Sequence, residues 1–242
     1  MKNILALLLA AFTAHAGLLE YKAGDTTCEG YLAGPATGNP PGILVVHDWM
    51  GQGRFSMAKA DELAKLGYVA FAADIYGKGV RPANAQEAGT QAGKYKSDRA
   101  LLRARVNAAL TELQKHADPK RIAAIGYCFG GTTVLELARS GADVAGVVSF
   151  HGGLDAPLPA TTIRCKILAL HGADDPYVPP AEVAGFEAEM TKAGADWQLI
   201  KYSGAVHAFT NPDAHSAGAA YNERADKRSW DAMKLFFAEI FR

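Results

Sequence analysis

Short apolar runs alternate with longer segments of mixed polarity along most of the chain. The run 43–47 is apolar almost throughout, which is typical of a strand buried on both faces. The segment 55–66 instead carries apolar residues at Met57, Leu63 and Leu66, which predicts a helix. The repeated alternation predicts a mostly parallel central sheet flanked by helices on both faces.

The same reading gives the other elements. The predicted strands are 18–22, 27–32, 43–47, 68–72, 121–125, 144–150, 166–170 and 197–202. The predicted helices are 55–66, one or two helices over 85–116, a helix through Leu135, Leu137 and Ala138, then 181–193 and 229–241. Ligands of such sheets bind beyond the carboxyl ends of the strands, so the residues after each strand are the candidates for chemistry.

The first residues follow a different pattern. Lys2 supplies a positive charge, residues 4–12 form an unbroken apolar stretch, and Ala14 and Ala16 are small residues where a signal peptidase reads the chain. We therefore expect a secretory signal peptide over 1–16, a single domain over 17–242, and an exported protein, periplasmic or secreted. The alternative is an N-terminal helix packed on the domain. No other segment approaches the length of a membrane span.

Composition narrows the class of partner. The 25 Lys and Arg residues balance 25 Asp and Glu residues, so the sequence indicates no nucleic-acid partner. The cysteines are Cys28, Cys128 and Cys165, an odd number that leaves at least one free thiol in an exported protein. We expect no disulfide between Cys28 and Cys165. There is no CxxC, HExxH or Cys/His cluster at metal-ligand spacing, so we expect neither metal nor cofactor.

The segment GYCFG at 126–130 lies between a predicted strand and a predicted helix. Glycines two residues either side of Cys128 suit a very tight turn, because any side chain there would collide with the neighbouring strand or helix. The pattern is the nucleophile elbow G-x-S-x-G with cysteine in the serine position. The alternative is a buried cysteine in a glycine-rich turn.

Two other loops carry the partners that a nucleophilic thiol needs. His207 follows the predicted strand 197–202 and is the natural base, and Asp175 follows the strand 166–170 and would orient its imidazole. Asp174 competes for this role, but Asp175 precedes a proline that holds its backbone extended. The order Cys128, Asp175, His207 is the nucleophile, acid, histidine order of the α/β hydrolases, and predicts these three as catalytic.

The elbow also suggests how negative charge would be stabilised. A thiol at a helix start lies near free amides and the positive end of the helix dipole, which favours the thiolate. The backbone N–H groups of Phe129 and Trp49 are the expected oxyanion donors.

Several segments together resemble the dienelactone hydrolase family. They are GYCFGG at 126–131, HDWMG at 47–51, DIY at 74–76, the stretch 172–179 and VHAF at 206–209. The resemblance runs from about Gly30 to the C-terminus, and the elbow is its most specific part. It implies an α/β-hydrolase fold, a triad of Cys128, Asp175 and His207, and hydrolysis of a small ester or lactone through a thioester acyl-enzyme.

The resemblance also implies a role for Asp48. In the family, an acidic residue of this loop contacts the resting thiol and helps to activate it when substrate arrives. The family has glutamate there, one methylene longer. We expect the Asp48 carboxylate to disfavour the thiolate until substrate binds, unless the shorter side chain bonds to backbone instead.

The chain departs from the family at the substrate carboxylate clamp, which uses two arginines. One would stand four residues after His207, where this chain has Asn211, and the segment 86–93 lacks the other. Replacement cations could come from Arg54, Lys78, Arg81 or Lys94. The substrate is therefore left open.

The remaining candidates concern the pocket wall. The polar run 207–230 is read as a partial cover with Asn211 and Tyr221 as candidate substrate contacts, or as a solvated loop. His151 is expected to line the pocket, whereas His47 and His171 are expected to bond to loop backbone. The alternatives to a cysteine hydrolase are a non-catalytic binding or thiol-sensing protein, and a thiol-dependent peptidase or transferase.

Overall fold

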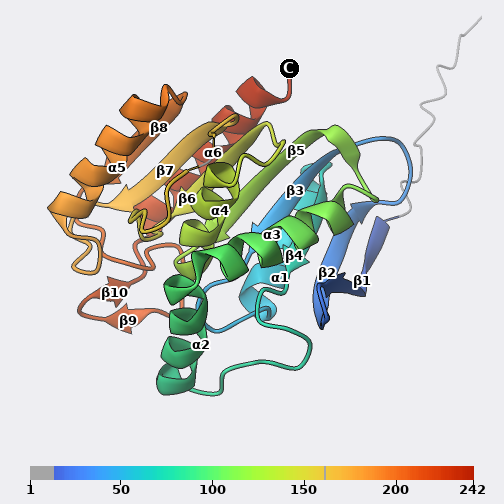
Figure 1. Cartoon of the computed structure of the whole chain (residues 1–242), viewed down its shortest axis with the longest axis horizontal. Coiled ribbons are helices and arrows are strands. Elements are labelled where there is room, and N and C mark those ends of the chain that lie inside the picture. The colour runs from blue at the N-terminus through green and yellow to red at the C-terminus, as the bar shows by residue number, and fades with distance from the viewer. Residues whose placement is uncertain (1–13, 161) are drawn as a thin grey trace, which may run out of the picture.

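A computed structural model describes residues 14–160 and 162–242, in which eight strands form one sheet in the order β1-β2-β4-β3-β5-β6-β7-β8 (Figure 1). The strands are β1 (Ala14–Ala23), β2 (Thr26–Pro35), β3 (Pro41–Val46), β4 (Val69–Ala73), β5 (Asp118–Tyr127), β6 (Gly146–Phe150), β7 (Lys166–Gly172) and β8 (Trp197–Tyr202), with a separate hairpin of β9 (His215–Ser216) and β10 (Ala219–Ala220). The helices are α1 (Arg54–Lys65), α2 (Ala85–Ser97), α3 (Arg99–Leu113), α4 (Phe129–Arg139), α5 (Pro180–Ala193) and α6 (Glu223–Ile240).

The sheet is parallel from β4 to β8, whereas β2 pairs antiparallel with both β1 and β4. This confirms the predicted fold class. The chain leaves β3 toward β4 on one side and leaves β5 toward β6 on the other, so the strand order reverses between β3 and β5. In an open α/β sheet this reversal opens a crevice beyond the carboxyl ends of the two strands. Asp48 and Trp49 follow β3 there, and Cys128 follows β5.

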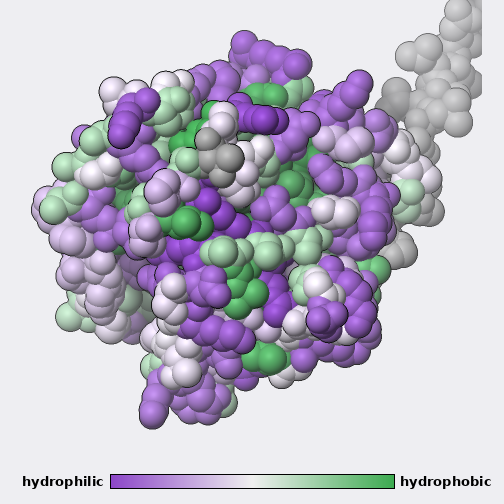
Figure 2. Space-filling model, viewed as in Figure 1, coloured by the Kyte–Doolittle hydropathy of each residue, from purple (hydrophilic) through white to green (hydrophobic). Residues whose placement is uncertain are grey.

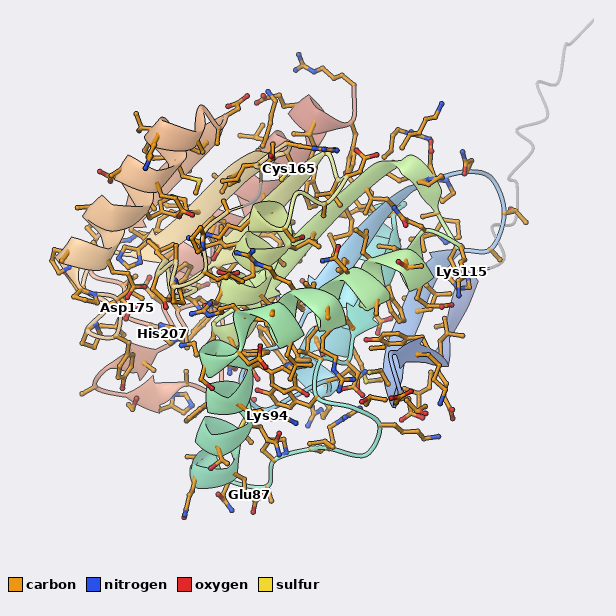
Figure 3. All side chains as sticks on the ribbon, in the orientation of Figure 1. Glu87, Lys94, Lys115, Cys165, Asp175 and His207 are labelled. Carbon is orange, nitrogen blue, oxygen red and sulfur yellow. The ribbon has the colours of Figure 1, made fainter. Side chains whose placement is uncertain are left out.

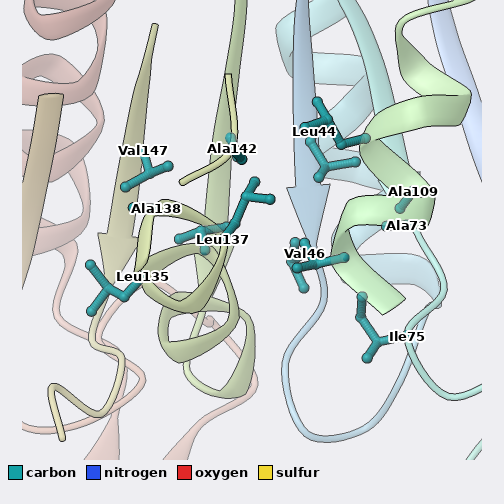
Figure 4. Packing of buried hydrophobic residues seen from close by; sticks show 14 of the residues in the cluster. Leu44, Val46, Ala73, Ile75, Ala109, Leu135, Leu137, Ala138, Ala142 and Val147 are labelled. Atoms are coloured by element: carbon teal, nitrogen blue, oxygen red, sulfur yellow. The ribbon is translucent and has the colours of Figure 1, made fainter. Parts of the chain in front are cut away.

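Helices cover both faces of the sheet. Alternate side chains of β3 point to opposite faces: Leu44 and Val46 pack beneath α2 to α5, whereas Ile43 and Val45 pack against α1 and α6. Figure 4 shows Leu44 and Val46 in the first of these layers. Burial on both faces explains why the central strands are apolar throughout. Figure 2 shows the outer surface of the α3 and α4 side, where hydrophilic residues prevail and hydrophobic ones form small separate groups.

Buried charges hold α4 in place. The Glu136 carboxylate is fully buried and pairs with Arg139 Nη1 at 3.0 Å and with Arg103 Nε of α3 at 2.8 Å. Arg139 Nη2 also pairs with Glu189 of α5 at 2.7 Å. A buried charge is tolerated only when it is paired, so this network ties the helix that follows Cys128 to two neighbouring helices.

The structure refines several predicted boundaries. The segment predicted as one or two helices forms two, because the Asp98 side chain accepts a hydrogen bond from Leu101 N–H and caps α3. The last helix begins at Glu223 rather than at 229, since Asn222 caps it by accepting from Ala225 N–H. The hairpin β9–β10 forms within the polar run 207–230, which carried no strand prediction.

The N-terminal prediction falls largely outside the described residues. Residues 1–13 are not described, and 14–16 belong to β1, where Ala14 pairs with Pro35 and Ala16 with Ala33. Removal of 1–16 would leave Gly17–Ala23 of β1 paired with β2. Within the described residues, no helix has the length and hydropathy needed to cross a bilayer.

Candidate active site

Cys128 lies in a strained turn between β5 and α4. Its φ is 54° and its ψ −113°, a backbone conformation that side-chain-bearing residues rarely adopt. A Cβ on Gly126 would lie 2.0 Å from Gly130 O, and one on Gly130 would lie 2.2 Å from Val46 O. The two glycines are therefore required by close backbone approach on both sides of the cysteine, as the sequence predicted.

The backbone around Cys128 leaves amide donors free. Cys128 N–H donates to Phe150 O at 3.0 Å and to His151 Nδ1 at 3.1 Å. In contrast, no group in the described part of the chain accepts a hydrogen bond from the N–H of Phe129 or Trp49. Phe129 opens α4, so its N–H lies at the positive end of that helix. These two predicted oxyanion donors thus remain available for a ligand oxygen.

Asp175 and His207 are in direct contact. Asp175 Oδ2 lies 2.7 Å from His207 Nδ1, and the carboxylate is fully buried. Asp175 Oδ1 accepts a second hydrogen bond from Tyr177 N–H at 2.8 Å. Asp174 is exposed to solvent. Of the two adjacent acids, the structure brings Asp175 to the histidine. Figure 3 shows Asp175 and His207 next to each other near the β9–β10 hairpin.

His207 sits in a loop tied to the hairpin. Its N–H donates to Gly218 O at 3.2 Å, and its carbonyl accepts from Ala220 N–H at 3.0 Å. Burial lowers the pKa of His207, but the hydrogen bond to Asp175 and the neighbouring Cys128 outweigh burial and raise that pKa to about 10. The imidazolium form is therefore favoured at neutral pH.

A cavity of about 580 Å³ joins these groups. Of the predicted residues, it is lined by Asp48, Trp49, Cys128, His151, His207 and Asn211. Tyr221 is not among its lining residues, and its hydroxyl donates to Asp226 at 3.2 Å instead. The cavity volume is within the range of small-molecule sites.

Asp48 bonds to backbone. Its Oδ1 accepts from Met50 N–H at 2.8 Å, and no described hydrogen bond joins it to Cys128. Burial raises the pKa of Asp48, and the Met50 N–H partly opposes this. The pKa of Tyr76 is raised chiefly by burial, and then by charge on Asp48 and on Cys128. Both groups therefore lie within electrostatic reach of the Tyr76 hydroxyl, which donates to Trp49 O at 3.0 Å.

Several residues of the cavity wall carried no site prediction, among them Lys96 and Tyr177. Tyr177 stands two residues after Asp175, and its ring packs edge-on against His207 at 5.4 Å between centroids. Lys96 comes from the end of α2, the helix on which Lys94 was offered as a replacement cation. None of the four proposed replacement cations lines the cavity. Lys78 pairs with Glu20 and Glu29, and Arg81 with Asp74.

His47 and His171, which also lie at strand ends, differ in their hydrogen bonds. His47 bonds to loop backbone as expected: Nδ1 lies 2.6 Å from Asp48 O, and Nε2 accepts from Ile75 N–H at 3.2 Å. For His171, the buried Nδ1 has no hydrogen-bond partner among the described residues. The expected hydrogen bond of the His171 side chain to loop backbone is therefore not made through Nδ1.

The three cysteines are unpaired in the structure. Cys28 and Cys165 are buried, whereas Cys128 is partly exposed. Burial raises the pKa of the Cys165 thiol to about 11. Within residues 14–160 and 162–242, no three His, Cys, Asp or Glu side chains form a group that could hold a metal ion.

The family model for the dienelactone hydrolase family matches residues 28–241. The chain belongs to this family. Its α/β-hydrolase fold and the hydrolase class follow. Two solved structures are similar over 95% of this chain and 99% of their own. They are m3DLH, at 38% identity and a TM-score of 0.91, and a dienelactone hydrolase-like promiscuous phosphotriesterase from metagenomic libraries, at 37% and 0.90.

A curated relative gives the same family at lower identity. It is a putative carboxymethylenebutenolidase of Aquifex aeolicus, 28% identical over 237 residues, which span 91% of this chain and 96% of the relative.

Proposed function

We propose that this dienelactone hydrolase family member hydrolyses a small ester or lactone through a thioester on Cys128. The observation that carries the proposal is the 2.7 Å contact of buried Asp175 with His207. His207 and Cys128 line the same cavity. A cysteine at the elbow, a base and an acid that orients the base are the parts that nucleophilic catalysis requires.

The first half of the reaction forms the acyl-enzyme. The Cys128 thiolate attacks the carbonyl carbon, and the C=O π electron pair moves to the oxygen. The N–H groups of Phe129 and Trp49 stabilise that oxyanion, an effect worth about 3 kcal/mol for one such donor. When the carbonyl re-forms, the C–O bond to the leaving group breaks, and His207 imidazolium gives its proton to the departing oxygen.

The second half returns the enzyme. Neutral His207 takes a proton from water, and the hydroxide attacks the thioester carbon. The C–S bond breaks as the second oxyanion collapses, which releases the acid and restores the thiolate beside the imidazolium. Asp175 bonds to Nδ1 throughout, so the free nitrogen Nε2 is the one that faces the sulfur and the water.

We propose that Asp48 acts on the resting thiol by its charge. The bond to Met50 N–H fixes the carboxylate, and Asp48 lines the same cavity as Cys128, which supports a position near the sulfur. A like charge disfavours the thiolate, and bound substrate would displace or neutralise it.

Lys96 is our candidate for substrate recognition, because among the described residues it is the one Lys or Arg that lines the cavity. It would favour acyl groups that carry a carboxylate away from the scissile bond. Asn211 and His151 line the same cavity, and we retain Asn211 as a polar contact. Tyr221 would reach the cavity only if its bond to Asp226 broke.

A second candidate substrate class is phosphotriesters. The 37%-identical relative is named a promiscuous phosphotriesterase, which favours trying this chemistry here. The thiolate would attack phosphorus, the same N–H groups would stabilise the negative charge on the phosphoryl oxygen, and the P–O bond to the leaving group would break with its electron pair. Water that gives a proton to His207 would then cleave the P–S bond and restore the thiolate. An ester and a phosphotriester with the same p-nitrophenolate leaving group would separate the two classes.

We also propose that the protein is exported. The charged start, the apolar stretch 4–12 and the small residues at 14 and 16 support this. N-terminal sequencing of the full chain expressed in a bacterium should find a mature protein in the periplasm that begins at Gly17. An intact Met1 on cytoplasmic protein would contradict the proposal.

The decisive test is release of p-nitrophenol from short-chain esters by the wild-type protein and by Cys128→Ala. We expect wild-type turnover and a loss of at least about 10³-fold in the variant, with an unchanged melting temperature because the thiol is partly exposed. A wild-type protein that binds but does not turn over any ester, lactone or phosphotriester would favour the binding or thiol-sensing alternative.

A further inference from the structure

His151 bridges the nucleophile and the loop that carries the base. It follows β6 directly, with 2% of its surface exposed. Its Nδ1 accepts the N–H of Cys128 at 3.1 Å, and its Nε2 lies 2.8 Å from Thr210 Oγ1. Thr210 is three residues after His207 and is 1% exposed. Two hydrogen bonds, one partly and one fully buried, thus connect the backbone of Cys128 to the His207 loop through one imidazole.

The hydrogen bonds fix the protonation state of this ring. Because Nδ1 accepts from an amide, its lone pair faces Cys128 and the ring hydrogen is on Nε2, where it donates to Thr210. A proton on Nδ1 would point the ring N–H at the Cys128 N–H, and two donors cannot form a hydrogen bond with each other. Burial first, and then the charge of His207, lower the pKa of His151 well below its usual range. His151 therefore stays neutral and does not serve as a second acid or base.

Ring packing adds to the bridge. The His151 ring meets His207 edge to face at 5.3 Å between centroids and meets Phe209 at 5.0 Å. Tyr177 packs on His207 at 5.4 Å. The imidazole of His207 is thus held by two rings as well as by Asp175.

Backbone strain is concentrated at the same place. Among the described residues, the non-glycine residues with positive φ are Cys128, His151 and Ala208. Each holds or adjoins a group of the site: the thiol, the bridging imidazole and the base. Strain of this kind persists only where surrounding contacts impose it. At His151 these contacts include the hydrogen bonds to Cys128 N–H and to Thr210.

We propose that His151 is a positioning residue that sets the separation of Cys128 from His207, with Thr210 as its second anchor. This rests on the proposed function. His207 gives a proton to the leaving oxygen and takes one from water at the carbon that Cys128 attacks, so its distance from the sulfur affects both steps. A looser bridge therefore slows the chemical steps and leaves substrate binding unchanged.

The test uses two variants that break the bridge, Thr210→Val and His151→Asn, and two controls, Thr210→Ser and Thr111→Val. Thr210→Val keeps the branched shape and removes the hydroxyl, and Thr210→Ser retains an oxygen for His151. His151→Asn keeps an acceptor for Cys128 N–H and tolerates positive φ, but does not reach Thr210. Thr111→Val on α3 is the matched control, because its hydroxyl also makes a single hydrogen bond, to Asn107 O.

We expect Thr210→Val and His151→Asn each to lower kcat about tenfold, or about 1.4 kcal/mol in the barrier, with KM within about twofold. The acidic limb of kcat/KM against pH should shift in both variants. Thr210→Ser and Thr111→Val should match wild type. The double variant should lose little more than the worse single variant, since both act through one bridge.

Wild-type kcat and an unshifted pH profile in Thr210→Val would overturn the positioning role. A loss of activity that follows only the folded fraction, measured by thermal melting, would do the same. If His151→Asn does not fold, Thr210→Val and Thr210→Ser decide the matter. If ester turnover by Cys128→Ala equals that of the wild type, the proposed function is refuted instead, whatever activity the Thr210 variants show.

Discussion

Asp175 Oδ2 lies 2.7 Å from His207 Nδ1, although the two residues are 32 positions apart in the chain. The loops after β7 and β8 bring them together, because parallel neighbours end at the same edge of the sheet. The buried carboxylate also raises the pKa of the histidine, so one contact sets both the orientation and the charge of the imidazole.

Asp175→Asn should lower kcat by about 10³- to 10⁴-fold without unfolding the protein. The amide cannot accept from Nδ1–H as the carboxylate does, and it favours the tautomer with Nδ1 as acceptor, which presents a proton to the sulfur. Asp174→Asn is the matched control and should be nearly neutral, because Asp174 is exposed. Ester hydrolysis and a thermal melt of both variants check this. A damaging Asp174→Asn beside a mild Asp175→Asn would reverse the assignment.

Asp48→Asn should speed alkylation of Cys128 by iodoacetamide near neutral pH and speed inactivation by peroxide. Removing a nearby negative charge favours the thiolate over the thiol, and the thiolate is the form that reacts. Asp213→Asn, which changes another carboxylate of the cavity wall, should have a smaller effect because Asp213 is exposed. The measurement is the alkylation rate against pH for the three proteins. Curves for Asp48→Asn and wild type that superimpose would mean that Asp48 has no influence on the sulfur.

His207 should stabilise the fold in a pH-dependent way. Its folded pKa, about 10, lies above its ordinary value, so the stabilisation is full below about pH 6.5 and is lost as pH rises through about 10. The melting-temperature difference between wild type and His207→Gln should therefore shrink from about pH 6 to about pH 10.5. A constant difference across that range would contradict the raised pKa.

Cys128→Ala offers a second readout of the same pKa. Cys128 is one of the causes that raise it, so the His207 titration followed by NMR should move to lower pH in the variant. An unmoved titration would mean that Asp175 alone holds the imidazolium.

Lys96→Ala should raise KM roughly two- to fivefold for esters whose acyl group carries a carboxylate, the range of a solvent-accessible ion pair. Neutral esters of the same length should be unaffected. Lys94→Ala is the matched control on the same helix: Lys94 lies over the Tyr95 ring and does not line the cavity. Equal effects of Lys96→Ala on charged and neutral esters would remove Lys96 from substrate recognition.

The sequence by itself determined the fold class and the elbow, because both depend on local rules. Strands buried on two faces must be apolar throughout, as in β4. At Gly126 a Cβ would lie only 2.0 Å from Gly130 O, so the turn accepts only glycine there. The loop positions of Asp175 and His207 followed from the strand ends, and the prolines and polar residues around them marked those loops.

The tertiary structure decided what distant segments do to one another. Lys96 reaches the cavity because α2 packs beside the crevice, and Tyr221 turns to Asp226 because Asn222 starts α6 early. The contact of Asp48 with Met50 N–H and the bridge from Cys128 through His151 to Thr210 likewise depend on distances between side chains. Periodicity and turn residues are local in the chain, whereas these contacts are fixed only when the whole core packs, so no pattern in the sequence announces them.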